Sequence, residues 1–163
     1  MSGVSDFLVQ DLAGNLVPFD KYSGLVLIIV NFASYCGLTN SNFNEMKSLN
    51  DKYYNRGLRV AAFPCNRVGY QALPVCEEDA RHFEFMVNQY GKVLVNGVPI
   101  IGKEDPLWRY LRNDQAATLF NARNANYNRF LVNRKGKVLA RHDSSVNSKS
   151  FEEEVVKLLD QLA

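Results

Sequence analysis

Length, composition and charge are those of an ordinary folded domain. The chain has 163 residues, 47% hydrophobic and 22% charged, and its formal net charge of +2 is too small to indicate binding to nucleic acid. Its length predicts a single domain over residues 1–163, and its longest apolar run, residues 25–30, is far too short for an integral membrane segment.

The first predicted elements are a β-hairpin and a buried strand. Residues 7–10 and 16–19 flank a stretch rich in turn formers, residues 11–15, which is the pattern of a hairpin. Residues 25–32 form a continuous apolar and β-branched run, typical of a strand buried on both faces. We therefore expect a central strand there.

A helix and a second strand are expected next. Thr39 can cap the helix, and Gly57 can end it. The apolar residues between them recur at helical intervals: Phe43, Met46, Leu49 and Tyr53. Residues 58–63 then read as a strand, parallel to the first if the helix is a right-handed crossover.

The second half of the chain is predicted to continue with a helix and short strands. Residues 77–89 carry acidic side chains where a first helical turn favours them, so we expect a helix there. Short strands are expected at residues 93–95 and 130–132. A turn at Lys135 and Gly136 leads into another strand at residues 137–140.

The last predicted helix completes the fold. Ser150 and Glu153 match a capping box. The apolar residues that this helix would bury are Val155, Leu158, Leu159 and Leu162. The element order predicts an α/β domain of thioredoxin-like type, with a mixed central sheet, flanking helices and an N-terminal hairpin. Ligands in such sheets bind beyond the carboxyl ends of the strands, where Cys36 and Cys65 fall.

The N-terminus and the cysteines bear on the compartment. Residues 1–6 lack the pattern of a secretory signal, so we expect a cytoplasmic protein in a reducing compartment. Three cysteines there indicate catalysis, metal binding or core packing rather than a disulfide scaffold. The cysteines are too far apart for a metal site, and only His82 lies near one of them. His82 and His142 fit solvent-facing positions, and neither is assigned as a catalytic base.

Basic residues gather loosely in one later part of the chain. They are Arg123, Arg129, Arg134, Lys135 and Lys137. Asparagines interrupt them and they span a predicted turn, so a solvated surface is the first interpretation. An anionic partner, such as a lipid head group or an acidic co-substrate, is the alternative.

Cys36 is the candidate reactive residue. It lies between the end of a buried strand and the start of a helix, in residues 31–39, which read NFASYCGLT. Free amide hydrogens and the positive end of the helix dipole stabilise an anion at such a position. A thiolate there would have a lowered pKa and be nucleophilic; an inert buried cysteine is the alternative.

Two motifs resemble the glutathione peroxidase family. The strand-to-helix segment is similar to the family signature N-V-A-S-x-C-G-x-T, and residues 63–71, FPCNRVGYQ, resemble F-P-C-N-Q-F-x-x-Q. Residues 95–97, 106–111 and 126–132 are similar to later family segments in the same order, so the resemblance spans nearly the whole chain. It implies that Cys36 is the peroxidatic residue, with Gln71 and Asn126 as its polar neighbours.

The sequence departs from the family pattern near the site. Ala125 replaces the tryptophan of the family's W-N-F segment, and Tyr35 stands where lysine is common. Trp108, the chain's one tryptophan, matches another family aromatic and is expected to serve in packing. Activity could be weaker or the substrate altered.

The other two cysteines receive different interpretations. Cys65 is expected to be a small buried hydrophobe. In the family, peroxide oxidises the peroxidatic cysteine to a sulfenic acid, which a second thiol must reduce. Members that supply this second thiol themselves have a cysteine farther along the following helix, at the position of Phe85 here. Cys76 lies earlier, so a structural role is favoured and a resolving role stays open.

The resemblance implies a thiol-dependent peroxidase that reduces hydrogen peroxide or organic, including lipid, hydroperoxides through a sulfenic acid at Cys36. It implies no metal or organic cofactor, a glutathione or thioredoxin-like reductant, and a monomer, since the chain lacks an extra loop before Asn126. The alternative is a redox sensor or binding protein that keeps the fold without turnover, which Ala125 favours. A thioredoxin-like oxidoreductase is disfavoured because Thr39 and Asn40 occupy the place of a second cysteine.

Overall fold

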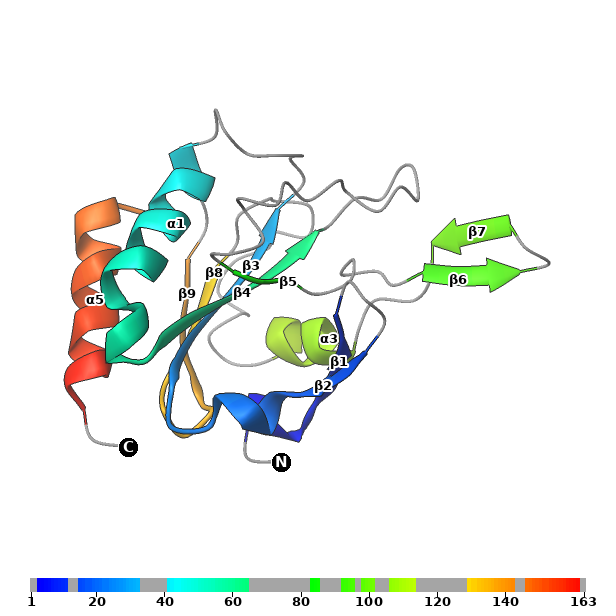
Figure 1. Ribbon diagram of the computed structural model, residues 1–163, viewed down its shortest axis with the longest axis horizontal. Coiled ribbons are helices and arrows are strands. Elements are labelled where there is room, and N and C mark those ends of the chain that lie inside the picture. Colours follow the sequence, from blue (N-terminus) through cyan, green and yellow to red (C-terminus); the bar gives the residue numbers. More distant parts are fainter. Residues whose placement is uncertain are drawn as a thin grey trace.

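The structure is a computed structural model, and it describes residues 3–11, 15–32, 41–64, 83–85, 92–95, 98–101, 106–113, 129–142 and 146–161. Its largest sheet has the strand order β5-β4-β3-β8-β9 (Figure 1). These strands are β3 (Val26–Phe32), β4 (Leu58–Pro64), β5 (Glu84–Phe85), β8 (Arg129–Val132) and β9 (Val138–His142). β3 pairs parallel with β4 and antiparallel with β8, so the predicted mixed sheet and its central strand are confirmed.

Helix α1 (Ser41–Tyr53) connects β3 to β4, as the helical periodicity predicts. A short 3-10 helix, η3 (Tyr54–Arg56), extends it to Gly57, whose φ of 107° is left-handed. Glycine adopts this conformation without the steric penalty of a Cβ, and it ends the helix here. The predicted stop at Gly57 is confirmed.

Helix α5 (Ser148–Asp160) begins differently from the prediction. Its N-cap is Asn147, whose Oδ1 accepts a hydrogen bond from the Ser150 backbone N–H at 3.0 Å. The capping box of Ser150 and Glu153 is therefore wrong, because Ser150 already lies inside the helix. The expected burial of Val155, Leu158 and Leu159 is confirmed, whereas Leu162 lies outside the described residues.

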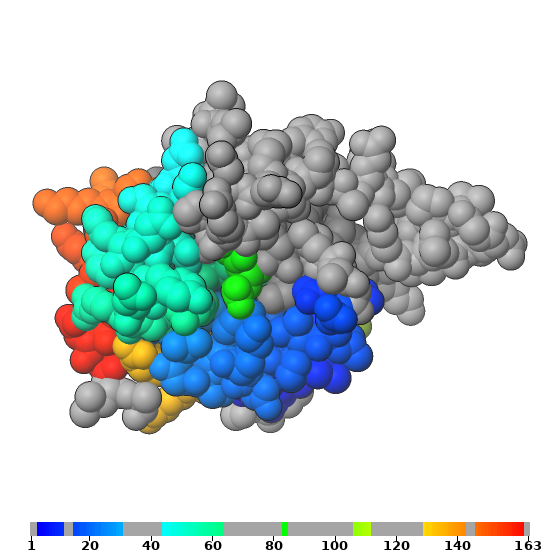
Figure 2. Space-filling view, in the orientation of Figure 1, coloured from blue at the N-terminus to red at the C-terminus, as the bar shows by residue number. Residues whose placement is uncertain are grey.

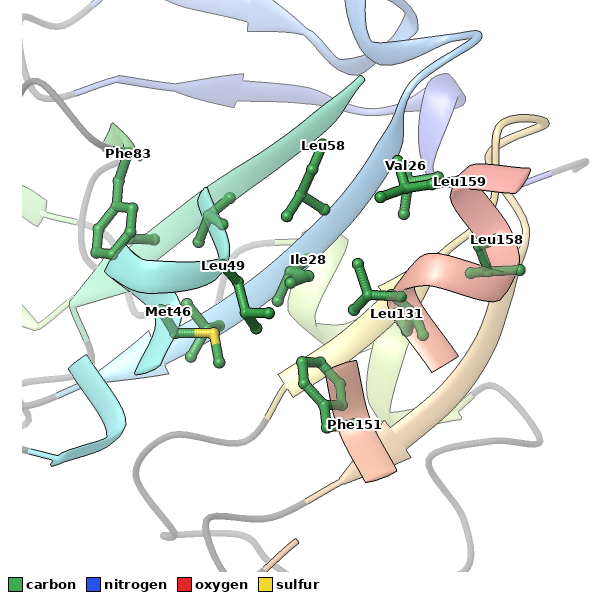
Figure 3. Packing of buried hydrophobic residues seen from close by; sticks show 14 residues of the cluster. Val26, Ile28, Met46, Leu49, Leu58, Phe83, Leu131, Phe151, Leu158 and Leu159 are labelled. Carbon is green, nitrogen blue, oxygen red and sulfur yellow. The ribbon is translucent and has the colours of Figure 1, made fainter. Parts of the chain in front are cut away.

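Both faces of the central sheet are covered. α1 and α5 lie side by side on one face (Figure 1), and their surfaces adjoin in the space-filling view (Figure 2). Between them and the sheet lies one apolar cluster, which includes Ile28, Met46 and Phe151 (Figure 3). A second cluster on the opposite face contains Phe63 and Trp108, where α3 (Pro106–Asn113) packs.

The N-terminal hairpin is confirmed. β1 (Leu8–Gln10) and β2 (Leu16–Pro18) pair antiparallel, with short 3-10 helices before and after them, η1 (Val4–Asp6) and η2 (Phe19–Tyr22). A second antiparallel pair, β6 (Lys92–Val95) and β7 (Val98–Ile101), projects from one side of the molecule (Figure 1). The sequence predicts the first of these two strands but not the second.

The helix predicted over residues 77–89 is wrong at residues 83–85, the described part of that range. β5 pairs parallel with β4, with Glu84 opposite Ala61 and Phe85 opposite Ala62. Phe83 is buried in the cluster beneath α1, while Glu84 accepts a hydrogen bond from Tyr22 Oη at 3.2 Å. Burial chiefly, and then the Glu84 charge, raise the pKa of Tyr22.

Candidate active site

The carboxyl ends of β3 and β4 lie next to each other at one edge of the central sheet. Phe32, the last residue of β3, pairs with Pro64, the last residue of β4. The segment that contains Cys36 leaves the sheet at Phe32 and leads into α1, and Cys65 directly follows Pro64. Two of the segments singled out from the sequence therefore join the sheet at neighbouring positions.

A third segment reaches the same edge from the opposite direction. β8 runs antiparallel to β3, and its first residue, Arg129, pairs with Val30 near the end of β3. Asn126 comes just before this strand. The residues at which these two segments join the sheet, Phe32 and Arg129, thus lie at one end of it, the end where ligands bind in open α/β sheets.

The predicted site residues themselves lie outside the described residues. These are Cys36, Gln71, Asn126 and Cys76, together with Cys65, Tyr35, Ala125 and His82. Their assigned roles stay predictions. The structure describes the frame to which their segments connect: the strand ends, the first turns of α1 and the side chains that tie these elements together.

Arg129 is the central side chain of this frame. It is 0% exposed, and its Nη1 donates a hydrogen bond to Glu45 Oε2 of α1 at 2.6 Å. The other Glu45 oxygen, Oε1, accepts from Ser148 Oγ at the first residue of α5, at 3.0 Å. The Arg129 guanidinium carbon lies 4.8 Å from the centre of the Phe151 ring. One buried guanidinium thereby contacts both helices that cover this face of the sheet.

The interpretation of the basic residues as a solvated surface is confirmed for Lys135 and Lys137, which are exposed, and is wrong for Arg129. Arg129 is buried and ion-paired. Arg134 is half-buried, and its guanidinium donates to main-chain carbonyls, including those of Gly24 and Leu159. The signal for the burial of Arg129 is its position directly before the apolar strand predicted at residues 130–132, since every residue of β8 is buried.

Trp108 serves in packing, as predicted. It is 2% exposed, and its ring meets those of Phe63 and Phe130 edge-on, with centroids 5.4 and 5.6 Å away. Phe63 pairs with Asn31, so this aromatic cluster begins close to the carboxyl ends of β3 and β4. Trp108 supports the sheet from the face opposite Arg129.

The described residues offer little for a metal ion. No group of three or more His, Cys, Asp or Glu side chains that could hold one occurs among them. His142 is the last residue of β9, at a strand end as predicted, and its Nε2 lies 2.8 Å from Glu154 Oε2. Within the same part of the chain, no helix has the length and apolar character needed to cross a membrane.

Solved structures establish the fold. The crystal structure of Trgpx in its apo form matches with a TM-score of 0.70 and 27% sequence identity, covering 99% of this chain and 97% of that one. A thiol:disulfide interchange protein of the thioredoxin family from Chlorobium tepidum matches with a TM-score of 0.61 and 15% identity, covering 94% and 92%. The domain has a thioredoxin-like fold, as predicted.

Sequence comparisons establish the family. The family model described as glutathione peroxidase matches residues 4–112. Glutathione peroxidase 1 of Caenorhabditis elegans is 40% identical over 166 residues, covering 99% of each chain. A Citrus sinensis protein named "Probable phospholipid hydroperoxide glutathione peroxidase" is 37% identical, covering 98% of this chain and 95% of its own. Fold and sequence together define a peroxidase of the oxidoreductase class. The chain belongs to the glutathione peroxidase family.

Proposed function

We propose that this protein reduces hydrogen peroxide and organic hydroperoxides, lipid hydroperoxides among them, with Cys36 as the attacking thiolate. The observation that supports the proposal most is the sequence position of Cys36, in the segment that connects Phe32, the last residue of β3, to Ser41, the first residue of α1. A helix N-terminus stabilises a thiolate through its free amide hydrogens and its dipole. The family membership supports the same reaction.

The proposed first step is a displacement at oxygen. The Cys36 sulfur attacks one peroxide oxygen, the S–O bond forms and the O–O bond breaks. The leaving hydroxide or alkoxide takes up a proton and departs as water or an alcohol. Cys36 is oxidised to a sulfenic acid while the peroxide is reduced, and two external thiols then restore the thiol through a mixed disulfide.

Gln71 and Asn126 are proposed as hydrogen-bond donors to the sulfur and to the charge that develops on the leaving oxygen. Amide groups donate without removing the proton that the leaving group needs. Removal of one preorganised donor typically slows a reaction by roughly tenfold to a thousandfold. Gln71→Ala and Asn126→Ala should each slow oxidation of Cys36 within that range.

The reductant is proposed to be an external thiol such as glutathione. A disulfide requires two α-carbons within about 7 Å, and Cys76 does not occupy the position of the family's internal resolving cysteine. The residue at that position, Phe85, lies in strand β5 rather than in the helix that the sequence predicts. Peptide mapping after one equivalent of peroxide tests this: a rapid Cys36–Cys76 disulfide would overturn it and indicate a thioredoxin-like reductant.

Substrate turnover tests the peroxidase proposal as a whole. Purified protein with glutathione should consume hydrogen peroxide and a phospholipid hydroperoxide, and Cys36→Ser should abolish both activities because an alcohol is barely ionised near neutral pH. Cys65→Ser is the matched control and should retain turnover. Undiminished turnover in Cys36→Ser would refute the assignment. No turnover in the wild type with either glutathione or a thioredoxin as the reductant would favour a redox sensor or binding protein.

A further inference from the structure

A buried ion pair joins the two elements that flank the proposed site. Arg129 opens β8, and Glu45 lies in the first half of α1. The salt bridge between Arg129 Nη1 and Glu45 Oε2 measures 2.6 Å, and the side chains are 0% and 16% exposed. It is far less accessible to solvent than the ion pair between α1 and α5, formed by Lys52 and Glu152, whose side chains are 56% and 31% exposed.

Further contacts fix the orientation of both side chains of this ion pair. Ser148 Oγ donates to Glu45 Oε1, and Phe151 lies beneath the guanidinium, so the carboxylate and the guanidinium each have a second contact in α5. A buried ion pair contributes little net stability compared with apolar residues of similar volume, but its hydrogen bonds constrain relative position. Here they constrain the first turns of α1 against the start of β8.

The start of α1 and the start of β8 are the points at which the segments of Cys36 and Asn126 end. In the sequence, Cys36 precedes Ser41, the first residue of α1, and Asn126 precedes Arg129 by three residues. A shift of α1 against β8 would therefore change the separation between the two segments. Hydrogen bonds weaken steeply with distance and angle, so an amide donor to sulfur is sensitive to such a shift.

We propose that Glu45 and Arg129 are positioning residues for the peroxidase reaction, and that their ion pair sets the Cys36 segment relative to the Asn126 segment. The inference rests on the proposed function. It assigns an indirect role to two residues that join α1 to β8. Their effect on the rate passes through Asn126.

A double-mutant cycle with Asn126 tests this role. Glu45→Gln keeps the shape of the side chain and removes its charge. It should slow oxidation of Cys36 by hydrogen peroxide by about tenfold to a hundredfold, the effect of misplacing a catalytic contact. In an Asn126→Ala background the same substitution should change the rate less than about twofold, because the contact that it positions is already absent.

A second reaction separates positioning from loss of structure. Alkylation of Cys36 by iodoacetamide, followed across pH, needs the thiolate but no leaving-group stabilisation. The limiting rate of alkylation at high pH should be the same in Glu45→Gln and in the wild type.

A second variant serves if Glu45→Gln does not fold. Arg129→Lys keeps the charge of the side chain but not its planar fork, and it should slow peroxide oxidation less than Glu45→Gln does. Lys52→Gln breaks the exposed α1–α5 pair and should leave both rates unchanged.

The outcomes are distinguishable. If wild-type Cys36 reacts rapidly with peroxide and the Glu45 and Arg129 variants equal it, the positioning role is wrong and the proposed function stands. The positioning role is also wrong if Glu45→Gln slows peroxide oxidation by the same factor with and without Asn126. It is likewise wrong if Glu45→Gln slows oxidation and alkylation by the same factor. If wild-type Cys36 reacts no faster than a free cysteine, the proposed function falls and the inference falls with it.

Discussion

Arg134 links three separate parts of the backbone through one side chain. Its guanidinium donates to the carbonyls of Gly24, Arg56 and Leu159 at 2.7, 3.2 and 2.8 Å, and its Nε donates to the carbonyl of Gln161. The last two carbonyls lie at the C-terminus of α5, where the helix has no internal donors left for them. A cation there also interacts favourably with the helix dipole.

Removal of this side chain should therefore destabilise the fold. Hydrogen bonds to charged groups contribute about 1.5–3 kcal/mol each when shielded, and less when exposed, so we expect Arg134→Ala to lower the free energy of unfolding by about 2–4 kcal/mol. Urea denaturation measures the loss. Arg134→Lys keeps the charge but reaches fewer carbonyls, and should lose about half as much. A change below about 0.5 kcal/mol in Arg134→Ala, the usual effect of a surface substitution, would contradict this role.

Two buried residues next to the site, Arg129 and Trp108, are not equally predictable from the sequence. Trp108 is apolar and fits the ordinary rule that large aromatic residues lie inside. Arg129 breaks that rule, because only the combination of a buried strand with a carboxylate on a distant helix makes its burial possible. No local pattern in the sequence pairs Glu45 with Arg129.

At the scale of elements, the turn at Gly57 requires a backbone conformation that favours glycine. Its φ of 107° is left-handed, and a Cβ added there would lie 2.9 Å from Arg134 Nη1. Gly57→Ala should therefore cost more than the ~1–2 kcal/mol of left-handed strain alone. Gly24→Ala is the matched control, since Gly24 has a φ of 86° with nothing within 4 Å of an added Cβ. Equal losses in urea denaturation would show that contact with Arg134 is unimportant.

The contact between α1 and α5 predicts a pH dependence. Hydrogen bonds from Lys52 and then Tyr53 hold the pKa of Glu152 below its usual value. A lowered folded-state pKa stabilises the protein above the unfolded-state value, near 4.5, and that contribution is lost as the pH falls through the folded value.

Glu152→Gln should therefore reduce the loss of stability on acidification below about pH 4.5. Thermal unfolding of the wild type and the variant at pH 7 and at pH 3 measures this loss of stability. The wild type should lose more stability between the two values, and Glu153→Gln, on the neighbouring residue, serves as the control. An identical pH dependence of stability in wild type and Glu152→Gln would show that this contact does not contribute to stability.

The elements differ in how far the sequence determines them. β3, α1 and α5 have long, strongly periodic patterns, and their existence and type are predictable. At residues 83–85 the sequence predicts a helix, because acidic residues upstream favour one, whereas pairing with β4 and the burial of Phe83 select a strand. Tertiary contacts override local preference in such short segments.

At the scale of the molecule, the two apolar clusters share the central sheet. Ile28 contributes to the cluster beneath α1 and α5, while its neighbours Leu27 and Ile29 contribute to the one beneath α3. Alternate residues of one strand thus join both clusters. We expect the two faces to unfold together rather than as separate units.

Leu158→Ala tests this coupling from one face while Trp108 reports from the other. Leu158 is 5% exposed, and truncating a buried leucine costs about 2–5 kcal/mol. The unfolding midpoint should fall by the same amount whether followed by Trp108 fluorescence or by far-ultraviolet circular dichroism. If the fluorescence midpoint stays at its wild-type value while the dichroism midpoint falls, the two faces unfold independently.

The overall architecture was predictable because hairpin, β-α-β unit and terminal β-β-α unit follow from patterns of burial along the chain. The family was predictable because its motifs occur in order around Cys36. The arrangement of the frame was not, since the Glu45–Arg129 pair depends on long-range contacts between segments far apart in the sequence.

The central claim is that Cys36 is the residue oxidised by peroxide. The direct measurement is trapping of sulfenic acid with dimedone after one equivalent of hydrogen peroxide, followed by peptide mapping of all three cysteines. The account predicts one dimedone adduct, on Cys36, formed within the first turnover and absent in Cys36→Ser. An adduct on Cys65 or Cys76 while Cys36 remains a free thiol would contradict it.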